Sequence, residues 1–142
     1  AEAQGMKINK IDHICIAVKD LEQAKKVWEP ILGKSEPDDA YVDEPEKINV
    51  ARYMVGEVGF ELMESTTPNG EVAKFIRRAG EGVMLISYNV DNCGEALDKL
   101  KANKVKLIDQ KPRLFAEYNR NFAFIHPAPM HGILTEIIDG KY

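Results

Sequence analysis

Three side chains of this chain are of types that bind metal ions and transfer protons, and each lies in a stretch that alternates like a β-strand. They are one histidine, His13, and two acids, Glu61 and Glu136. Neighbouring side chains of a strand point to opposite faces, so a polar residue among apolar neighbours faces away from them. One imidazole and two carboxylates on a shared inner face would suit metal binding or acid–base catalysis.

Each of these residues also has an ordinary structural explanation. A single histidine in a strand is more often a core or surface residue than a ligand, and a glutamate in a last strand usually faces solvent. Two other histidines are weaker candidates. His126 precedes Pro127 and is expected to end a strand and fix the turn that follows, whereas His131 lies in a loop and is expected to be exposed.

An internal duplication strengthens the functional interpretation. Residues 13–24 align without a gap with residues 85–96, an offset of 72 (85 minus 13). Both stretches predict a strand, then a helix that begins after a capping residue, Asp20 in the first copy and Asn92 in the second. The four corresponding positions in the first and last strands of the two copies hold His13, Glu61, Leu85 and Glu136. Three of these four are polar.

The elements that must position these residues follow from hydrophobic periodicity and turn residues. We expect strands at 11–18, 49–55, 58–64, 83–90, 120–126 and 132–138, helices after Asp20 (to Gly33) and Asn92, a short helix from Glu71 to Ala79, and hairpin turns at 57–59 and 131–132.

The predicted fold is α+β, with two βαβββ modules in tandem that form a curled mixed sheet around a cavity. The modules are assigned to residues 6–64 and 82–140, joined by a linker at 65–81, and together make one domain over 6–140. Modules of this size do not close a core well alone, so they are expected to pack together. Residues 1–5 precede Met6 and are interpreted as a cloning remnant.

Composition narrows the class of protein. The chain has 142 residues, 44% of them hydrophobic and 30% charged, with a formal net charge of -4. This balance argues against a nucleic-acid partner. No stretch approaches the roughly 20 apolar residues that span a bilayer, and no signal peptide is evident, so no membrane partner is expected. Cys15 and Cys93 are expected to be buried free thiols, which suits a cytoplasmic location.

Several segments resemble one known family. They are the opening strand 11–18, the capped helix 20–33, the strand 60–64, the segments 72–75 and 80–82, and the closing strands 123–127 and 132–136. In order and spacing these segments resemble the vicinal oxygen chelate (glyoxalase/bleomycin-resistance) superfamily, and within it the methylmalonyl-CoA epimerase family. The resemblance extends from Ile8 to Asp139.

The resemblance implies a fold, a reaction and a set of residues. Members pair two βαβββ modules around a cavity, often with a divalent metal and often as a homodimer. The epimerase removes a proton next to a thioester and returns it on the other face. By this resemblance, His13, Glu61 and Glu136 are the metal ligands, Glu136 and Glu46 are the catalytic acid–base pair, and the substrate is a small molecule such as an acyl-CoA.

One position departs from the family pattern. The strand that begins the second half carries a histidine ligand in the epimerases, but this chain has Leu85 there. Three outcomes stay open. The remaining ligands could hold a divalent ion (Co, Mn, Zn, Fe, Ni or Mg). The metal could be absent, in which case two carboxylates would repel and one would keep its proton. The fold could serve only to bind a ligand.

These alternatives give a ranking of functions. An epimerase-like isomerase with an incomplete or altered metal site comes first, and a lyase of the same superfamily comes second. A non-catalytic, resistance-type binding protein comes third. A basic cluster at Lys74, Arg77 and Arg78 could meet an anionic ligand such as coenzyme A, although exposed charges on a helix are usually only solvated.

Overall fold

The computed structural model describes residues 6–141. The chain divides into two compact units. The contiguous unit runs from His13 to Met84, and the split unit joins the residues up to Asp12 to those from Leu85 onward. The first strand, β1 (Lys10–Ala17), begins in the split unit and continues into the contiguous unit. The assignment of 6–140 to a single domain stays a prediction, and residues 1–5 lie outside the described residues.

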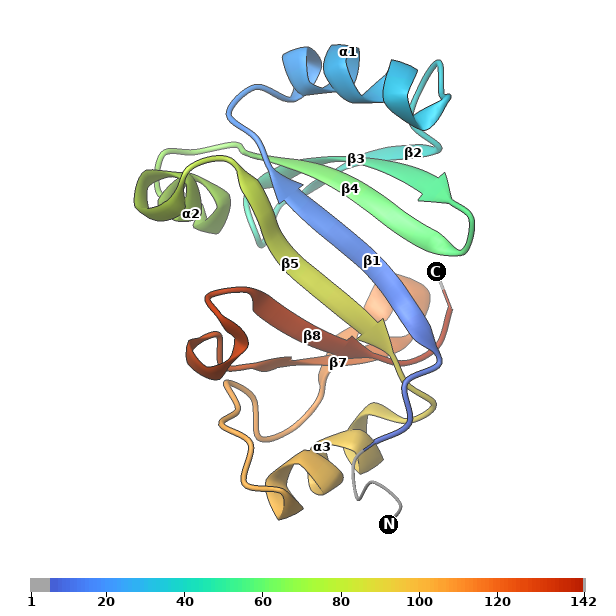
Figure 1. Cartoon of the computed structure of the whole chain (residues 1–142), viewed down its shortest axis with the longest axis vertical. Helices are drawn as coiled ribbons and strands as arrows, with labels where there is room; N and C mark the ends of the chain where they lie inside the picture. Colours follow the sequence, from blue (N-terminus) through green and yellow to red (C-terminus); the bar gives the residue numbers. More distant parts are fainter. Residues whose placement is uncertain (1–5, 142) are drawn as a thin grey trace. The chain divides into compact units, whose positions relative to one another are not determined.

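The contiguous unit is a βαβββ module followed by a short helix (Figure 1). After β1 come α1 (Leu21–Leu32), β2 (Asp39–Asp43), β3 (Ile48–Val55), β4 (Val58–Ser65) and α2 (Glu71–Ala79). The strand order is β2-β3-β4-β1, with β1 parallel to β4 and the other pairs antiparallel. The parallel pair is possible because α1 and two strands separate β1 from β4 in the chain.

The split unit repeats this order. Its elements are β5 (Gly82–Asn89, of which the first residues belong to the contiguous unit), α3 (Cys93–Ala102), β6 (Arg113–Phe115), the 3-10 helix η1 (Ala116–Tyr118), β7 (Arg120–Ile125), the 3-10 helix η2 (Ala128–Met130) and β8 (Leu134–Ile138). The strand order is β5-β8-β7-β6, with β5 parallel to β8. The predicted α+β fold of two βαβββ modules is confirmed.

Both long helices begin at the predicted capping residues. The Asp20 carboxylate accepts a hydrogen bond from the Gln23 amide at 3.1 Å, and the Asn92 side chain accepts one from the Glu95 amide at 2.9 Å. Each bond satisfies one amide that has no partner within the helix. Gly33 ends α1 in the left-handed conformation at φ 69°, as predicted.

The helices cover the sheets on defined faces. α1 packs over one face of the contiguous unit's sheet, where it buries Ile16, Tyr53 and Leu62. Val72 and Phe75 of α2 pack against the other face. In the split unit α3 lies against β7 and β8 (Figure 1). Among the described residues, no helix is long and apolar enough to cross a membrane.

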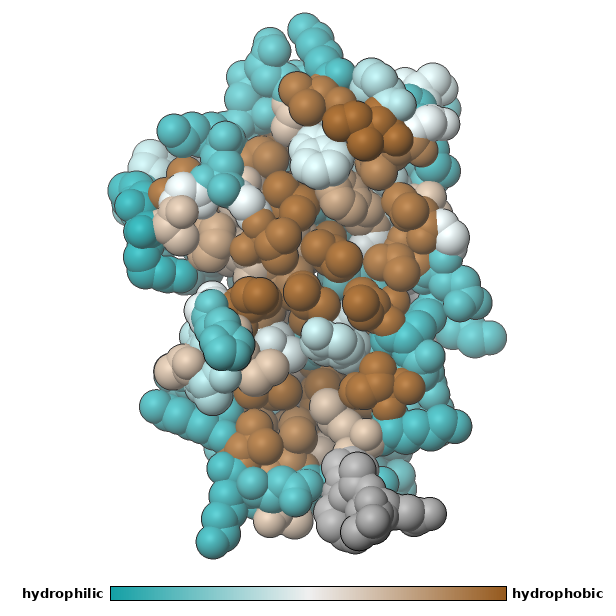
Figure 2. Space-filling model, in the orientation of Figure 1, coloured by the Kyte–Doolittle hydropathy of each residue, from teal (hydrophilic) through white to brown (hydrophobic). Residues whose placement is uncertain are grey.

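Part of the apolar surface stays exposed on α1. Val27 is 61% exposed and Ile31 is 68% exposed. Figure 2 shows brown, apolar side chains over this helix. Both residues lie on the side of α1 that does not face the sheet, so the core beneath does not account for them.

Two details of the fold differ from the sequence-based expectation. The first hairpin turns at Gly56–Glu57 rather than at 57–59, because Gly56 takes the positive φ of 61° that such a turn requires and Val58 already belongs to β4. The edge strands β2 and β6 were not located from the sequence. β6 has only three residues, too few for a recognisable alternation.

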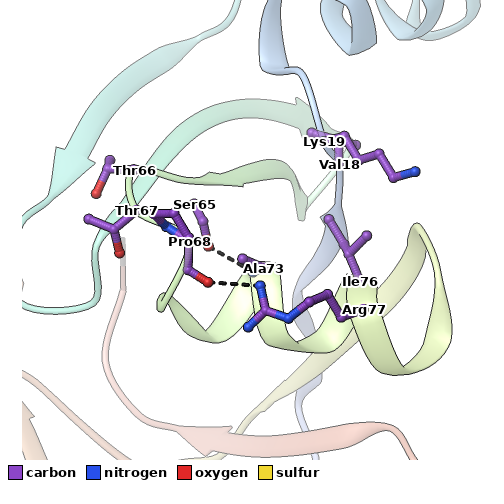
Figure 3. Close-up of a pocket in the computed structure, with 9 residues that line it drawn as sticks. All are labelled: Val18, Lys19, Ser65, Thr66, Thr67, Pro68, Ala73, Ile76 and Arg77. Atoms are coloured by element: carbon purple, nitrogen blue, oxygen red, sulfur yellow. Dashed lines mark hydrogen bonds between the residues drawn. The ribbon is translucent and has the colours of Figure 1, made fainter.

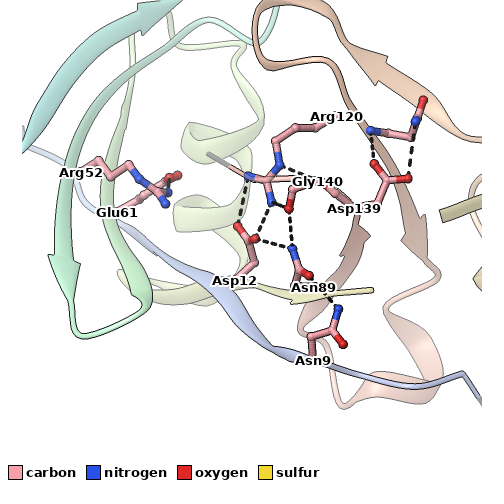
Figure 4. Close-up of polar contacts among 9 residues, drawn as sticks. Asn9, Asp12, Arg52, Glu61, Asn89, Arg120, Asp139 and Gly140 are labelled. Carbon is pink, nitrogen blue, oxygen red and sulfur yellow. Dashed lines mark hydrogen bonds and ion pairs between the residues drawn. The ribbon is translucent and has the colours of Figure 1, made fainter. Parts of the chain in front are cut away.

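A polar clamp holds the start of β1 to the end of the split unit (Figure 4). Asp12 and Arg120 form an ion pair in which both side chains are almost completely buried. Asn89 donates hydrogen bonds of 3.0 Å both to the Asp12 carboxylate and to the Gly140 carbonyl. The Arg120 Nε donates to the Asp139 carbonyl at 2.9 Å. Buried charges persist in proteins when they are paired and hydrogen-bonded in this way.

Candidate functional site

A row of polar residues crosses the contiguous unit's sheet on the face opposite α1. The strand register places Cys15 beside Glu61, Glu61 beside Arg52, and Arg52 beside Asp39. Residues that are direct register partners share a face of the sheet. β1, β4, β3 and β2 therefore each contribute one polar side chain to this row. Glu61 and Arg52 are buried, at 5% and 3% exposure.

His13 lies on the same face, two residues before Cys15 in β1. Its register partner on β4 is Gly59. One ligand atom each from His13, Cys15 and Glu61 lies within 4.8 Å of the others. The structure thus brings together His13 and Glu61, as predicted, and adds Cys15. The thiol of Cys15 lies 3.5 Å from the Glu61 carboxylate.

Arg52 is the counter-ion of Glu61. Its Nη1 contacts the Glu61 carboxylate in a fully buried ion pair (Figure 4). The guanidinium lies over Gly59, where a Cβ would overlap its atoms. Gly59 is therefore the residue that leaves room for the cation.

Tyr41 adds a phenol near this row. Burial raises the pKa of Tyr41 far above its ordinary value, and the negative charge of Glu61 adds to the shift. The phenol therefore keeps its proton over the whole physiological range. It remains a hydrogen-bond donor on β2, where its register partner is Val50.

The donor set can be tested for its fit to a divalent ion. An imidazole, a thiol and a carboxylate are ligands that zinc, cobalt and iron accept, and their spacing is compatible with one ion. The carboxylate, however, already has the Arg52 guanidinium as its counter-charge. As the side chains are arranged, they do not fit a divalent ion.

Glu136 lies in the split unit, in β8, and is buried at 7% exposure. Its register partners are Ser87 on β5 and Phe124 on β7. These positions match those of Cys15 and Arg52 around Glu61, so the duplication extends to the surroundings of the acid. The difference is that Phe124 on β7 has the position that Arg52 has on β3. Leu85, the departure from the family pattern, is buried two register pairs away, on the same face as Ser87.

The other predicted residues lie elsewhere. Glu46 is exposed in the turn between β2 and β3, beyond the Asp43–Ile48 pair that ends the hairpin ladder. Its catalytic role stays a prediction. His126 accepts a hydrogen bond at Nδ1 from the Ala128 amide at 3.1 Å, so it fixes the turn as predicted, and His131 is exposed. Cys15 and Cys93 are buried and neither belongs to a disulfide, as predicted.

An open pocket of about 410 Å³ lies beside α2 in the contiguous unit (Figure 3). Lys19 and Arg77 give it positive charge, and Arg77 donates to the Pro68 carbonyl at 2.8 Å. Ser65 accepts from the Ala73 amide at 2.7 Å. The rest of the lining is Val18, Thr66, Thr67 and Ile76. Hydroxyl groups and two cations beside apolar side chains suit an anionic ligand with a hydrophobic part.

Sequence reasoning missed Cys15, Tyr41 and Arg52 as members of the site. The signal for Cys15 was its spacing of two from His13 on one strand, which puts both on one face. Arg52 lies between Ala51 and Tyr53 in a predicted strand, and a charge inside such a stretch indicates a buried partner. Nothing in the sequence identified that partner as Glu61.

Comparisons with known proteins agree with this architecture. The family model described as Glyoxalase/Bleomycin resistance protein/Dioxygenase superfamily matches residues 12–124. The Bacillus subtilis protein YqjC, named as uncharacterized, is 34% identical over 134 residues, which are 94% of each chain. The human mitochondrial methylmalonyl-CoA epimerase is 27% identical over 131 residues, 92% of this chain and 73% of that protein. A solved structure of the Streptomyces coelicolor methylmalonyl-CoA epimerase with 2-nitronate-propionyl-CoA is similar with a TM-score of 0.82 and 25% identity, covering 94% of this chain and 96% of that one.

Proposed function

The chain belongs to the glyoxalase/bleomycin resistance protein/dioxygenase superfamily, and on this premise we propose that it is an epimerase-like isomerase of a small acyl substrate. The reaction removes a proton from the carbon next to a thioester or carboxylate and returns one on the opposite face. Two methylmalonyl-CoA epimerases resemble the chain over more than nine-tenths of its length.

The observation that carries this proposal is the different setting of the two related acids. Glu61 is neutralised by Arg52 in a buried ion pair. Glu136 occupies the equivalent register position, but its register partner on β7 is Phe124. A base must reach the substrate proton, and the Glu61 carboxylate already contacts a guanidinium. Of the two, Glu136 is the one suited to act as base.

The proposed step moves one proton and one electron pair. The carbon–hydrogen bond of the substrate breaks, the proton goes to the Glu136 carboxylate, and the electron pair moves to the carbonyl oxygen to form an enolate. Reprotonation of the carbon completes the inversion, and Glu46 remains the predicted second acid–base group. Enolate formation needs positive charge or hydrogen-bond donors near that oxygen.

A divalent ion commonly supplies that charge in this superfamily by polarising the substrate oxygen. The ligands predicted for it are His13, Glu61 and Glu136, with Leu85 in place of a fourth. In the contiguous unit Cys15 joins His13 and Glu61, and Arg52 already occupies the carboxylate. The proposed step therefore relies on the side chains of the chain itself.

The substrate is proposed to be an acyl-CoA. The support is the pocket beside α2, where Lys19 and Arg77 could meet phosphate groups of the coenzyme. We further propose, from the family resemblance, a homodimer located in the cytoplasm. Light scattering of the purified protein measures its mass and would contradict the dimer if it gave that of one chain.

Proton exchange at carbon tests the function directly. Racemic methylmalonyl-CoA incubated with the protein in D₂O is expected to acquire deuterium at C2 well above the buffer rate, and Glu136→Gln is expected to lower this rate at least about a hundredfold, as loss of a general base does. Mass spectrometry of the recovered thioester measures the exchange.

The matched control is Glu64→Gln, an acid on β4 that caps the start of α1 through the Leu21 amide and is not placed in the site. It is expected to exchange at the wild-type rate. Exchange at the buffer rate by wild type, with every simple 2-methyl acyl-CoA tried, would contradict the isomerase. Thermal stabilisation by the same thioesters without any exchange would favour the binding protein instead.

A further inference from the structure

A buried guanidinium and a potential metal site occupy the same place in the contiguous unit. The three potential ligand atoms of His13, Cys15 and Glu61 lie within 4.8 Å of one another. The guanidinium of Arg52 contacts the same Glu61 carboxylate and lies over Gly59, the strand partner of His13. The guanidinium therefore extends from Glu61 toward the His13–Gly59 register pair.

Two cations do not share such a carboxylate without a large cost. Like charges a few ångströms apart repel strongly where water is scarce, and one buried carboxylate needs only one counter-charge. Arg52 is buried, and the missing Cβ of Gly59 leaves room for its guanidinium. The register partner of Arg52 on β2 is Asp39.

We propose that Arg52 takes the place of a divalent metal ion at Glu61, and that the His13–Cys15–Glu61 cluster is a latent metal site which the guanidinium keeps closed. Arg52 is thus the resident cation of the site, and the wild-type protein works without a divalent ion. The further role of this charge, to favour an enolate, rests on the proposed function, whereas the exclusion of metal does not.

Replacement of the guanidinium by an apolar chain of similar length should open the metal site. Arg52→Met leaves Glu61 without this counter-charge, so Co²⁺ is expected to bind this variant at least about tenfold more tightly than wild type. Chelator-treated protein is titrated with Co²⁺, with calorimetry for the affinity and the near-ultraviolet thiolate-to-cobalt absorption for the ligation of Cys15.

Three variants control this result. Arg52→Lys keeps the positive charge and is expected to stay as weak as wild type. Cys15→Ser in the Arg52→Met background is expected to lose the near-ultraviolet band. Gly59→Ala keeps Arg52 but puts a Cβ where the guanidinium lies, so it is expected to displace the guanidinium and raise the affinity for Co²⁺.

Wild type that shows the thiolate band and binds Co²⁺ as tightly as Arg52→Met would overturn the proposal. If Arg52→Met fails to fold, wild type and Gly59→Ala decide the question. Deuterium exchange separates this inference from the proposed function. Exchange by wild type that persists in excess chelator supports both the isomerase and the replacement of the metal by Arg52. Exchange that appears only with added metal overturns the replacement and leaves the isomerase standing. If wild type shows no exchange while the Co²⁺ titrations give the expected results, only the proposed isomerase is overturned.

Discussion

Glu61 and Glu136 are the same residue type at equivalent positions, yet their neighbours give the two carboxylates different surroundings. The sequence predicted both acids and His13 from alternation and from the duplication, and the structure places His13 and Glu61 together. What the sequence could not predict was the partner of each acid. A partner is set by strand register, and register depends on turns such as Gly56–Glu57 that shift it by whole residues.

Cys93 gives a prediction that depends on pH. Burial raises the pKa of its thiol to about 12, and the nearby Asp139 carboxylate adds to the shift. The folded state therefore holds the proton more tightly than the unfolded state, whose thiol has the ordinary pKa of 9.0. Its contribution to stability is complete below about pH 9 and is lost as the pH rises toward 12.

Urea unfolding at pH 8, 10 and 11 measures this loss. The free energy of unfolding of wild type is expected to fall more steeply between pH 8 and 11 than that of Cys93→Ala, whatever the offset between the two proteins at pH 8. Parallel curves for the two proteins would contradict the assignment. In the native state at pH 8, Cys93 is also expected to resist alkylation that it undergoes readily in urea.

Helices and long strands were predictable because they carry local signals, whereas the short edge strands β2 and β6 are defined by pairing alone. α1 and α3 begin directly after the predicted capping residues, and α2 begins at Glu71 after the predicted turn. α1 ends at Gly33, as expected. β6 has three residues and owes its strand conformation to its ladder with β7. No local pattern announces such an element.

The two helix caps, Asp20 and Asn92, allow a test of these local signals. Asp20→Ala and Asn92→Ala each remove one hydrogen bond to a helix amide and are each expected to lower the free energy of unfolding by about 1 kcal/mol. Serine at either position should restore most of the loss. Urea unfolding measures both, and a loss below about 0.3 kcal/mol for both alanine variants would show that these caps contribute little.

The pocket beside α2 makes a prediction about substrate binding. Lys19→Gln and Arg77→Gln each remove one cation from it, so each is expected to raise the KM for an acyl-CoA about threefold to tenfold at low salt and to leave kcat unchanged. The KM for the same acyl group on pantetheine, which lacks the nucleotide, should not change.

Arg78→Gln is the matched control, because Arg78 is exposed on the same helix, stacks on Phe75 and does not line the pocket. Steady-state kinetics measures all three variants. An equal rise in KM for the CoA and pantetheine substrates would mean that these cations do not meet the nucleotide part.

For the molecule as a whole, we expect stability to depend on the clamp between Asp12 and Arg120. Arg120→Met removes the Arg120 counter-ion of the buried Asp12 carboxylate and is expected to cost about 3–5 kcal/mol, a large part of the stability of a protein of this size. Asp12→Asn in the same background should recover part of this loss, because it removes the buried charge.

Thermal unfolding measures these variants against Arg113→Gln. Arg113 also pairs with an acid, Asp109, but its side chain is 45% exposed, so its loss is expected to cost no more than about 1 kcal/mol. Similar costs for Arg113→Gln and Arg120→Met would contradict the central place of the clamp.

The same clamp bears on the order in which the chain acquires its structure. Asp12 and Arg120 are 108 residues apart, whereas the contiguous unit closes within residues 13–84. During synthesis from the amino terminus, the whole contiguous unit therefore emerges while the partner of Asp12 does not yet exist. Until Arg120 emerges, Asp12 stays a hydrated surface charge, and its burial is a late event. Clamp variants should accordingly speed unfolding more than they slow folding.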